Sequence, residues 1–407
     1  MNVLLSAFAC SPRLGSEDGI GWRWATEIAN LSHNVHVLTR TAYRSDIEAV
    51  LPDLPYQERL TFHYLDLSPS VGYEGFGKIV GYVYIYVWQV LAYLHARKLV
   101  RLHDFALTHH ITFGTIRFPS FLGLLPPPLV YGPAGGGETA PKSLRKGYSS
   151  RGKVLDLVRD LSNQLVRIDP LANLTFATSE LLLLRTKEND KFVPQQFRHK
   201  IVHVPEVAVD TSPLPASRAK SVEGLRIIYI GRFLYWKGMH LGIAAFAKLA
   251  RVHPDVSLTM VGKGHEGKQW KQLAVELGVE GRIKWIEWVE KSSVPAIYAA
   301  HDVLLFPSLH DAGANVVYEA ASHGLPTVCL DLGAPGEIVG AQNGMVVATA
   351  DRGENEVAQA LADCLAQLQS DREALSSLSA SARAWAKTQN WQNRVGSVYQ
   401  MVVAKIG

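Results

Sequence analysis

The sequence is poor in cysteine, lacks a long uninterrupted apolar run, and carries no large excess of either charge. Its 407 residues include only three cysteines, Cys10, Cys329 and Cys364, with no Cys-x-x-Cys pair. So sparse and odd a set argues against a disulfide framework or a zinc site, and predicts a reducing, cytoplasmic compartment. The 41 lysines and arginines against 37 aspartates and glutamates give a net charge of +4, too mild to indicate nucleic acid as a partner.

Several catalytic signatures are also missing. The sequence has no Walker loop, no Gly-x-Ser-x-Gly, no Asp-x-Asp pair and no internal repeat. No charged segment precedes the apolar residues 3–9, so we expect a first strand there and not a signal peptide.

One apolar segment is a candidate for contact with a membrane. Residues 79–94 are almost uncharged and rich in tyrosine, and Arg97, Lys98 and Arg101 follow them. The segment is shorter than the roughly 20 residues that a spanning helix needs. A core-facing helix is the preferred interpretation. A helix at a membrane surface or acceptor groove comes second, and a spanning helix last.

The length exceeds that of one ordinary hydrophobic core, so two domains are expected. Apolar runs predict strands at residues 3–9, 35–39, 105–111, 129–131, 225–230, 256–261, 283–289, 303–306 and 327–330. A stretch rich in proline, serine and alanine at residues 205–223 predicts a linker between two α/β halves. Helical sequence is expected over residues 356–386 and 391–405.

The most informative stretch is residues 306–339. A strand is followed by a turn of small and polar residues, a helix that Gly324 ends, and another strand. The first-turn N–H groups of such a helix favour an anion or a polar hydroxyl. Asp311 and Glu319, with seven residues between them, are carboxylates that could accept hydrogen bonds from hydroxyl groups. A buried strand–helix–strand unit with a solvated acid at each end explains the same pattern.

A second loop carries two cations. Arg232 and Lys237 lie between the predicted strand at 225–230 and a helix expected from His240. Two cations beside a helix N-terminus suit a diphosphate group, and two solvated loop cations are the alternative.

Together the two loops resemble those of the retaining glycosyltransferases of family 4. The shared residues are Gly231-Arg232, Lys237-Gly238, a carboxylate at 311, Glu319-Ala320, Gly324 and Pro326. Asp311 stands where the family usually has glutamate, and Trp288 stands where glycine is common. The resemblance implies an α/β protein of the GT-B fold, with two Rossmann-like domains facing a cleft. Residues 1–207 would form the acceptor domain, residues 208–385 the donor domain, and residues 386–407 a helix that crosses back to the first domain, with Trp391 as its anchor.

The resemblance also implies roles in the second half. Arg232 and Lys237 would stabilise the leaving diphosphate, Glu319 would hold the ribose, and Val289 would lie beside the base. The sugar would be held by Asp311 and by the backbone at Gly313, Ala314 and Asn315.

In the first half the implied site residues are fewer. Gly19, in a glycine-rich loop at 15–21, would face the donor. His109, with His110 as the alternative, would lie near the donor sugar, and Gly135 and Gly136 would lie on the acceptor side. A tight turn, a structural histidine and a flexible loop are the plainer interpretations. Residues 142–153, with five basic side chains, are expected to form an exposed, mobile segment.

The implied reaction transfers a sugar from a nucleotide-diphosphate sugar to an acceptor hydroxyl with retained configuration. It would need no metal or other cofactor, because Asp-x-Asp is absent and Arg232 and Lys237 would neutralise the phosphates. The acceptor is expected to be a glycan, lipid-linked as in bacterial surface polysaccharide synthesis, reached by peripheral contact with the inner face of an anionic membrane. The alternatives are a nucleotide-sugar epimerase of the same fold and an inactive sugar-nucleotide binder.

Overall fold

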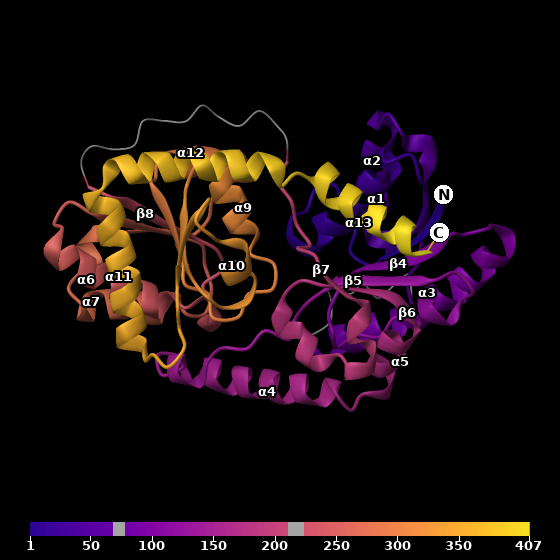
Figure 1. Ribbon diagram of the computed structural model, residues 1–407, viewed down its shortest axis with the longest axis horizontal. Coiled ribbons are helices and arrows are strands. Elements are labelled where there is room, and N and C mark those ends of the chain that lie inside the picture. Colours follow the sequence, from indigo (N-terminus) through magenta and orange to yellow (C-terminus); the bar gives the residue numbers. More distant parts are fainter. Residues whose placement is uncertain (68–77, 211–223, 407) are drawn as a thin grey trace. The chain divides into compact units, whose positions relative to one another are not determined.

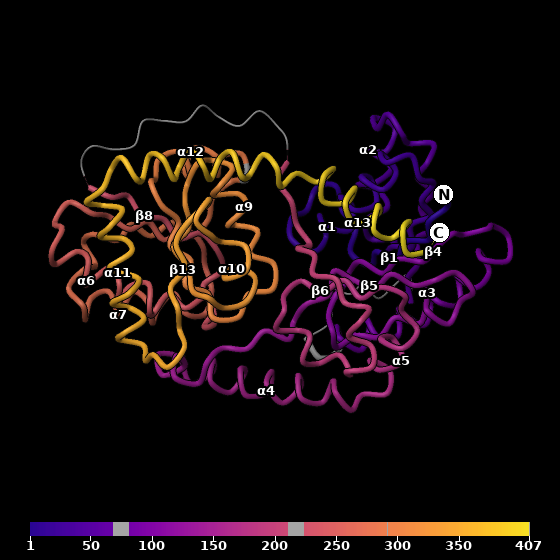
Figure 2. The backbone as a smooth tube through the Cα atoms, viewed as in Figure 1, coloured from indigo at the N-terminus to yellow at the C-terminus, as the bar shows by residue number. Residues whose placement is uncertain are grey.

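The computed structural model describes residues 1–67, 78–210 and 224–406, and these form two compact units. Unit 1 comprises residues 1–137, 161–207 and 391–407, and unit 2 comprises residues 138–160 and 208–390. Much of the predicted linker, residues 211–223, lies outside the described residues. Each unit is an α/β domain (Figures 1 and 2).

Unit 1 is built on a seven-stranded parallel sheet with strand order β3-β2-β1-β4-β5-β6-β7. Its strands are β1 Asn2–Ala7, β2 Asn34–Thr39, β3 Leu60–Tyr64, β4 Leu107–Thr112, β5 Leu129–Ala134, β6 Ser179–Leu184 and β7 Ile201–His203. Its helices are α1 Ser16–Asn30, α2 Arg44–Val50, α3 Lys78–Leu102, α5 Pro170–Thr178 and α13 Trp391–Ile406. Helix α4, Ser150–Val166, begins in unit 2 and ends in unit 1.

Unit 2 has a six-stranded parallel sheet with strand order β10-β9-β8-β11-β12-β13. Its strands are β8 Arg226–Ile230, β9 Ser257–Val261, β10 Ile283–Ile286, β11 Val303–Phe306, β12 Thr327–Leu330 and β13 Gly344–Val347. Its helices are α6 Met239–Val252, α7 Gly267–Glu276, α8 Val294–Ala299, α9 Asn315–Ser322, α10 Gly333–Ile338, α11 Glu354–Ser370 and α12 Arg372–Thr388. Figure 1 shows α6, α7 and α11 grouped on one side of this sheet and α9 and α10 on the other.

The C-terminal helix returns to unit 1. Helix α13 packs beside α1, and the ring nitrogen Nδ1 of His109 lies 3.1 Å from the Tyr399 hydroxyl. Trp391, at the start of α13, is buried.

Three sequence predictions need correction. Residues 16–21 are the first turns of α1 and not a loop, and the strand predicted at 283–289 ends at Ile286. The helical sequence predicted at 356–386 is confirmed and is divided into α11 and α12, because the Asp371 side chain caps α12 by accepting from the Ala374 N–H. Residues 142–153 are not a mobile segment, since Leu144 and Tyr148 lie in the core of unit 2.

Candidate functional site

The sheet of unit 2 brings the two loops that the sequence singles out to one place. The strand order runs outward in opposite directions from β8 and β11, so these neighbours form the topological switch point. Ligands of open α/β sheets bind at the carboxyl ends of strands at such a point. Because β8 ends at Ile230 and β11 at Phe306, the loops at 231–238 and 307–314 both begin there.

Gly238 fixes the end of the first loop. It has φ +66° and ψ 16°, the left-handed conformation that glycine adopts without strain, and it caps α6. A Cβ atom at this position would lie 1.9 Å from the carbonyl oxygen of Pro307. The backbone of the first loop therefore lies directly against the second loop, which only glycine allows.

Lys237 and Asp311 join the two loops through an ion pair. The Lys237 ammonium donates to Asp311 Oδ2, and the Ser308 hydroxyl lies 3.3 Å from the same oxygen. The two side chains are only 14% and 15% exposed. Burial raises the pKa of the Asp311 carboxyl, but the charge and hydrogen bond of Lys237 and the Ala314 N–H outweigh it, so the pKa lies below its ordinary value. The carboxylate is therefore held ionised at the mouth of the site.

The second loop presents backbone N–H groups. Ala314, with φ +50° and ψ 40°, is the N-cap of α9, and no side chain in the described part of the chain caps this helix end. Asn315 begins the helix, and Gly313 before it is half-buried. Since first-turn N–H groups have no partner within the helix, a helix end of this kind suits an oxygen-rich ligand.

Glu319 lies one turn further along α9 and is exposed. The hydroxyl of Tyr298, from α8, donates to Glu319 Oε2 over 3.1 Å. Burial, followed by the nearby Glu319 charge, raises the pKa of Tyr298 well above its ordinary value, so this hydroxyl keeps its proton. The bond orients the Glu319 carboxylate while leaving it accessible to a ligand.

Arg232 is an exposed cation of the first loop. Its carbonyl accepts from the hydroxyl of Tyr229, 3.0 Å away, which holds the loop backbone. Within residues 1–67, 78–210 and 224–406 the Arg232 guanidinium forms no ion pair, in contrast to Lys237. Arg232 is thus the cation of the pair that is available to an anion.

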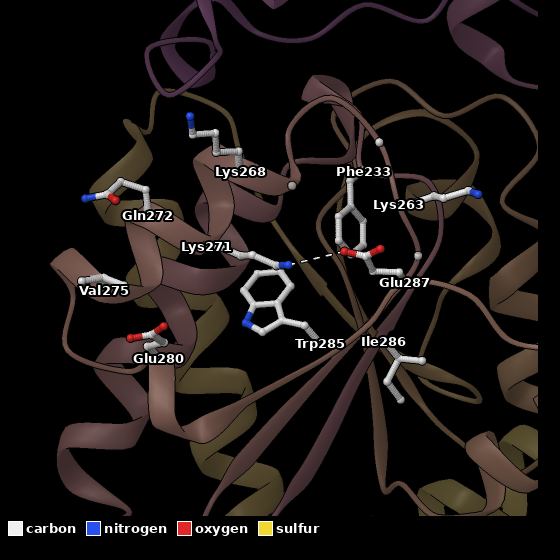
Figure 3. Close-up of a pocket in the computed structure, with 13 residues that line it drawn as sticks. Phe233, Lys263, Lys268, Lys271, Gln272, Val275, Glu280, Trp285, Ile286 and Glu287 are labelled. Carbon is white, nitrogen blue, oxygen red and sulfur yellow. Dashed lines mark ion pairs between the residues drawn. The ribbon is translucent and has the colours of Figure 1, made fainter.

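A cavity of about 510 Å³ opens beside this loop at the carboxyl ends of β9 and β10 (Figure 3). Phe233 and Trp285 form apolar walls, and the Lys271 ammonium lies 3.6 Å from Glu287 and 5.7 Å from the Trp285 ring centre. Val289, predicted to lie near a base, is partly buried against the core just after β10, whereas Trp288 is 68% exposed. The cavity combines aromatic walls with basic residues, a lining suited to a charged ligand with a planar ring.

A buried His–Asp pair supports the second loop. His310 Nε2 lies 3.1 Å from Asp156 Oδ1, and both side chains are 2% exposed. The His310 ring stacks on Trp236 at 5.3 Å. Asp156 comes from α4, so this helix is tied to the residue that precedes Asp311.

The predicted histidines of unit 1 are interior residues. His109 is fully buried, and its nitrogens lie 3.1 Å from the Tyr399 hydroxyl and 2.9 Å from the Gly132 carbonyl oxygen. Burial lowers the pKa of His109 to about 3 and that of His110, also fully buried, to about 4. Both rings are thus enclosed by the protein, and the two nitrogens of His109 already have partners.

The glycines of unit 1 are explained by close backbone approach. A Cβ at Gly19, in the first turn of α1, would lie 2.7 Å from the Leu14 carbonyl oxygen. The Gly135 N–H donates to the Gly114 carbonyl over 3.1 Å, and Gly136 has φ +99°. The segment at 135–136 is therefore anchored and is not the flexible loop of the plainer interpretation.

Sequence reasoning did not find three residues that shape the site: Ser308, Tyr298 and Asp156. Ser308 lies three positions before Asp311, and this proximity was the one signal available. Tyr298 and Asp156 reach the site from other elements, so no local spacing could have indicated them.

Comparisons with known proteins agree with this geometry. Residues 212–385 match the family model of the glycosyl transferases of group 1. The chain is 29% identical to glycogen synthase of Mycobacterium tuberculosis over 145 residues. This aligned stretch covers 35% of each of the two chains. It is 34% identical over 122 residues to the lipopolysaccharide core biosynthesis glycosyltransferase LpsE of Rhizobium meliloti, 30% of this chain and 33% of the relative. The matched stretch thus spans about a third of the length of these relatives.

The fold comparison covers nearly the whole chain. The structure of Anabaena HepE, solved with UDP and glucose, superposes with a TM-score of 0.60 over 99% of this chain and 100% of HepE, at 17% identity. This chain and HepE therefore share the same architecture despite their low sequence identity. Residues 212–385 are thus similar to the glycosyl transferases of group 1, and the chain as a whole has the GT-B fold.

Proposed function

We propose that this protein is a retaining glycosyltransferase of family 4 that transfers a hexosyl group from a nucleotide-diphosphate sugar to an acceptor hydroxyl. The observation that carries the proposal is the grouping of Lys237, Asp311, Arg232 and the uncapped N-terminus of α9 at the switch point of unit 2. The family match and the structure of HepE, which was solved with UDP and glucose, support a nucleotide sugar as the donor.

Each group has a role in this reaction. Negative charge develops on the leaving diphosphate, where the exposed Arg232 and the ammonium of Lys237 would stabilise it. When Lys237 turns toward the diphosphate, Asp311 is freed to accept hydrogen bonds from sugar hydroxyls. Glu319, oriented by Tyr298, would hold the ribose hydroxyls, and the N–H groups at Gly313 to Asn315 would donate to sugar oxygens.

The nucleoside part would occupy the cavity between Phe233 and Trp285, with Val289 at its edge. We propose that no metal is needed, because the two cations and the helix N-termini at α6 and α9 supply the positive charge.

The acceptor is proposed to be a glycan on a lipid carrier, reached from the cytoplasmic face of a membrane. The name of LpsE places that relative in lipopolysaccharide core synthesis. No helix in the described residues is long and apolar enough to cross a bilayer. Helix α3, however, contains no acidic residue and exposes the row Val83, Val87, Val90 and Leu94, while Trp88 of the same helix is buried.

The test is a thermal-shift screen of nucleotide sugars, followed by product analysis with the donor that binds. Transfer of the sugar with the donor's anomeric configuration supports the proposal. A new free sugar nucleotide without glycoside would identify an epimerase, and tight binding without turnover over a broad acceptor panel would identify an inactive binder.

A further inference from the structure

Helix α4 exposes its apolar face and buries its polar face, the opposite of an ordinary amphipathic surface helix. Its exposed face carries Val154, Leu157, Val158, Leu161 and Leu165, each between 52% and 68% exposed. These positions have the 3–4-residue spacing of one helical face, so they form a continuous apolar stripe. Figure 2 shows α4 as one uninterrupted helix, and Ile168, 76% exposed, follows its last turn.

Polar contacts hold the opposite face of α4 against the protein. Asp156 binds Arg145 over 2.8 Å as well as His310, and Asp160 binds Arg145 over 2.6 Å. The Asn163 side chain accepts from Arg117 Nε over 2.9 Å. Because buried polar side chains need such partners, these contacts fix which face is buried and leave the apolar stripe in water. An apolar face of this length in water indicates a surface that another body covers.

The charges beside the stripe are of one sign. Arg151 and Lys153 at the start of α4 and Arg167 just after its end are exposed. The only acidic residues of α4 are Asp156, which is buried, and Asp160, which is half-buried and paired with Arg145. Lys142 and Lys146 add exposed cations before the helix, whereas Arg145, counted with them in the sequence, is engaged by the two aspartates.

We infer that α4 is a docking helix that lies in the interface of an anionic lipid bilayer, with the apolar stripe among the acyl chains and the cations at the headgroups. An apolar face flanked by cations has this preference. A second copy of the chain fits less well, because cations at both ends of α4 would meet cations in either a parallel or an antiparallel pairing. The inference rests on the proposed function in taking this lipid surface to be that of the acceptor.

Docking would also reach the donor loop. Asp156 lies on the side of α4 opposite the stripe and binds His310, the neighbour of Asp311. A bilayer that holds α4 in place would therefore steady the loop that carries the sugar-binding carboxylate.

The test is co-sedimentation with vesicles made of equal parts phosphatidylglycerol and phosphatidylcholine, compared with phosphatidylcholine alone. The unaltered protein should sediment with the anionic vesicles and less so at high salt, because ions screen the attraction. Leu157→Ser combined with Leu161→Ser should lower the partition coefficient by roughly tenfold or more, since two apolar side chains no longer enter the interface. Both leucines are exposed, so the melting temperature should stay unchanged.

A matched pair of single variants controls for the loss of any exposed apolar side chain. Val158→Ser should weaken vesicle binding several-fold, whereas Val252→Ser, at a valine of α6 that is 74% exposed, should leave it unchanged. Equal effects of the two variants, no effect of the leucine pair, or no binding to anionic vesicles would each overturn the inference. Leucine-dependent dimers in light scattering without vesicle binding would identify a second copy as the occupant.

The two proposals fail separately. Vesicle binding is measured without any nucleotide, and the donor screen without any lipid. Docking with no donor in the screen would overturn the transferase proposal alone. Donor turnover without docking would overturn only the inference about α4.

Discussion

Replacing Lys237 by methionine should destabilise unit 2 by leaving the Asp311 carboxylate buried without its cation. Methionine keeps most of the length and apolar surface of lysine but removes the charge. With the two side chains 14% and 15% exposed, the pair is close to a buried ion pair. Removal of one partner from such a pair costs about 3–5 kcal/mol. For a domain of this size that corresponds to a melting temperature lower by about 6–20 °C.

The pH dependence identifies the cause. The native pKa of Asp311 lies below its ordinary value, so its pairing contributes stability above about pH 4 and loses it as pH falls through the lower native pKa. In Lys237→Met, burial without the cation should instead raise this pKa. The melting temperatures of the variant and the unaltered protein should therefore differ most at neutral pH and converge below about pH 4.

The assay is differential scanning calorimetry between pH 3.5 and 8. The double variant Lys237→Met with Asp311→Asn should recover much of the loss, because the buried charge is gone. Lys284→Met, at an exposed lysine of β10, should melt within about 1 °C of the unaltered protein. A Lys237→Met protein that melts within about 2 °C of the unaltered protein at pH 7 would refute the reasoning.

Three further predictions concern the ligand. Arg232→Ala should weaken nucleoside diphosphate binding by roughly ten- to a hundred-fold in calorimetry, through loss of a charge-assisted hydrogen bond of about 1.5–3 kcal/mol, with an unchanged melting temperature; unchanged affinity would remove Arg232 from the site. Glu319→Gln should raise the donor Kd by roughly tenfold while unfolding is little affected, and a lower melting temperature with normal donor binding would make Glu319 structural. Activity should survive EDTA, and complete loss that magnesium or manganese restores would contradict a metal-independent reaction.

The α/β class and the location of the loops could be predicted from local sequence patterns. Apolar runs such as residues 303–306 and 327–330 are strands at the predicted places. A buried parallel strand is a continuous run of apolar residues, which can be recognised locally in the sequence. Lys237-Gly238 could also be read locally, since the backbone conformation at Gly238 is a property of that residue type. The positions of loop cations and carboxylates therefore follow from sequence alone.

Which of these residues meet and which are enclosed depends on the folded arrangement of the strands and helices. The pairing of Lys237 with Asp311 depends on β8 lying next to β11, a neighbour relation between strands far apart in the chain. His109 lies within β4 and not at its end, and Tyr399 of α13 lies against its buried ring. Burial of this kind is set by elements distant in sequence.

Helix α4 shows the same limit most clearly. Residues 142–153 have the composition of a solvated basic loop, because this short stretch of sequence contains many charged and few apolar residues. In the fold, Arg145 turns to Asp156 and Asp160, the aspartates turn inward, and the valines and leucines that follow are left outside. Which face of an amphipathic helix is buried depends on the partners that contact its polar side chains. These partners come close to the helix only in the folded protein.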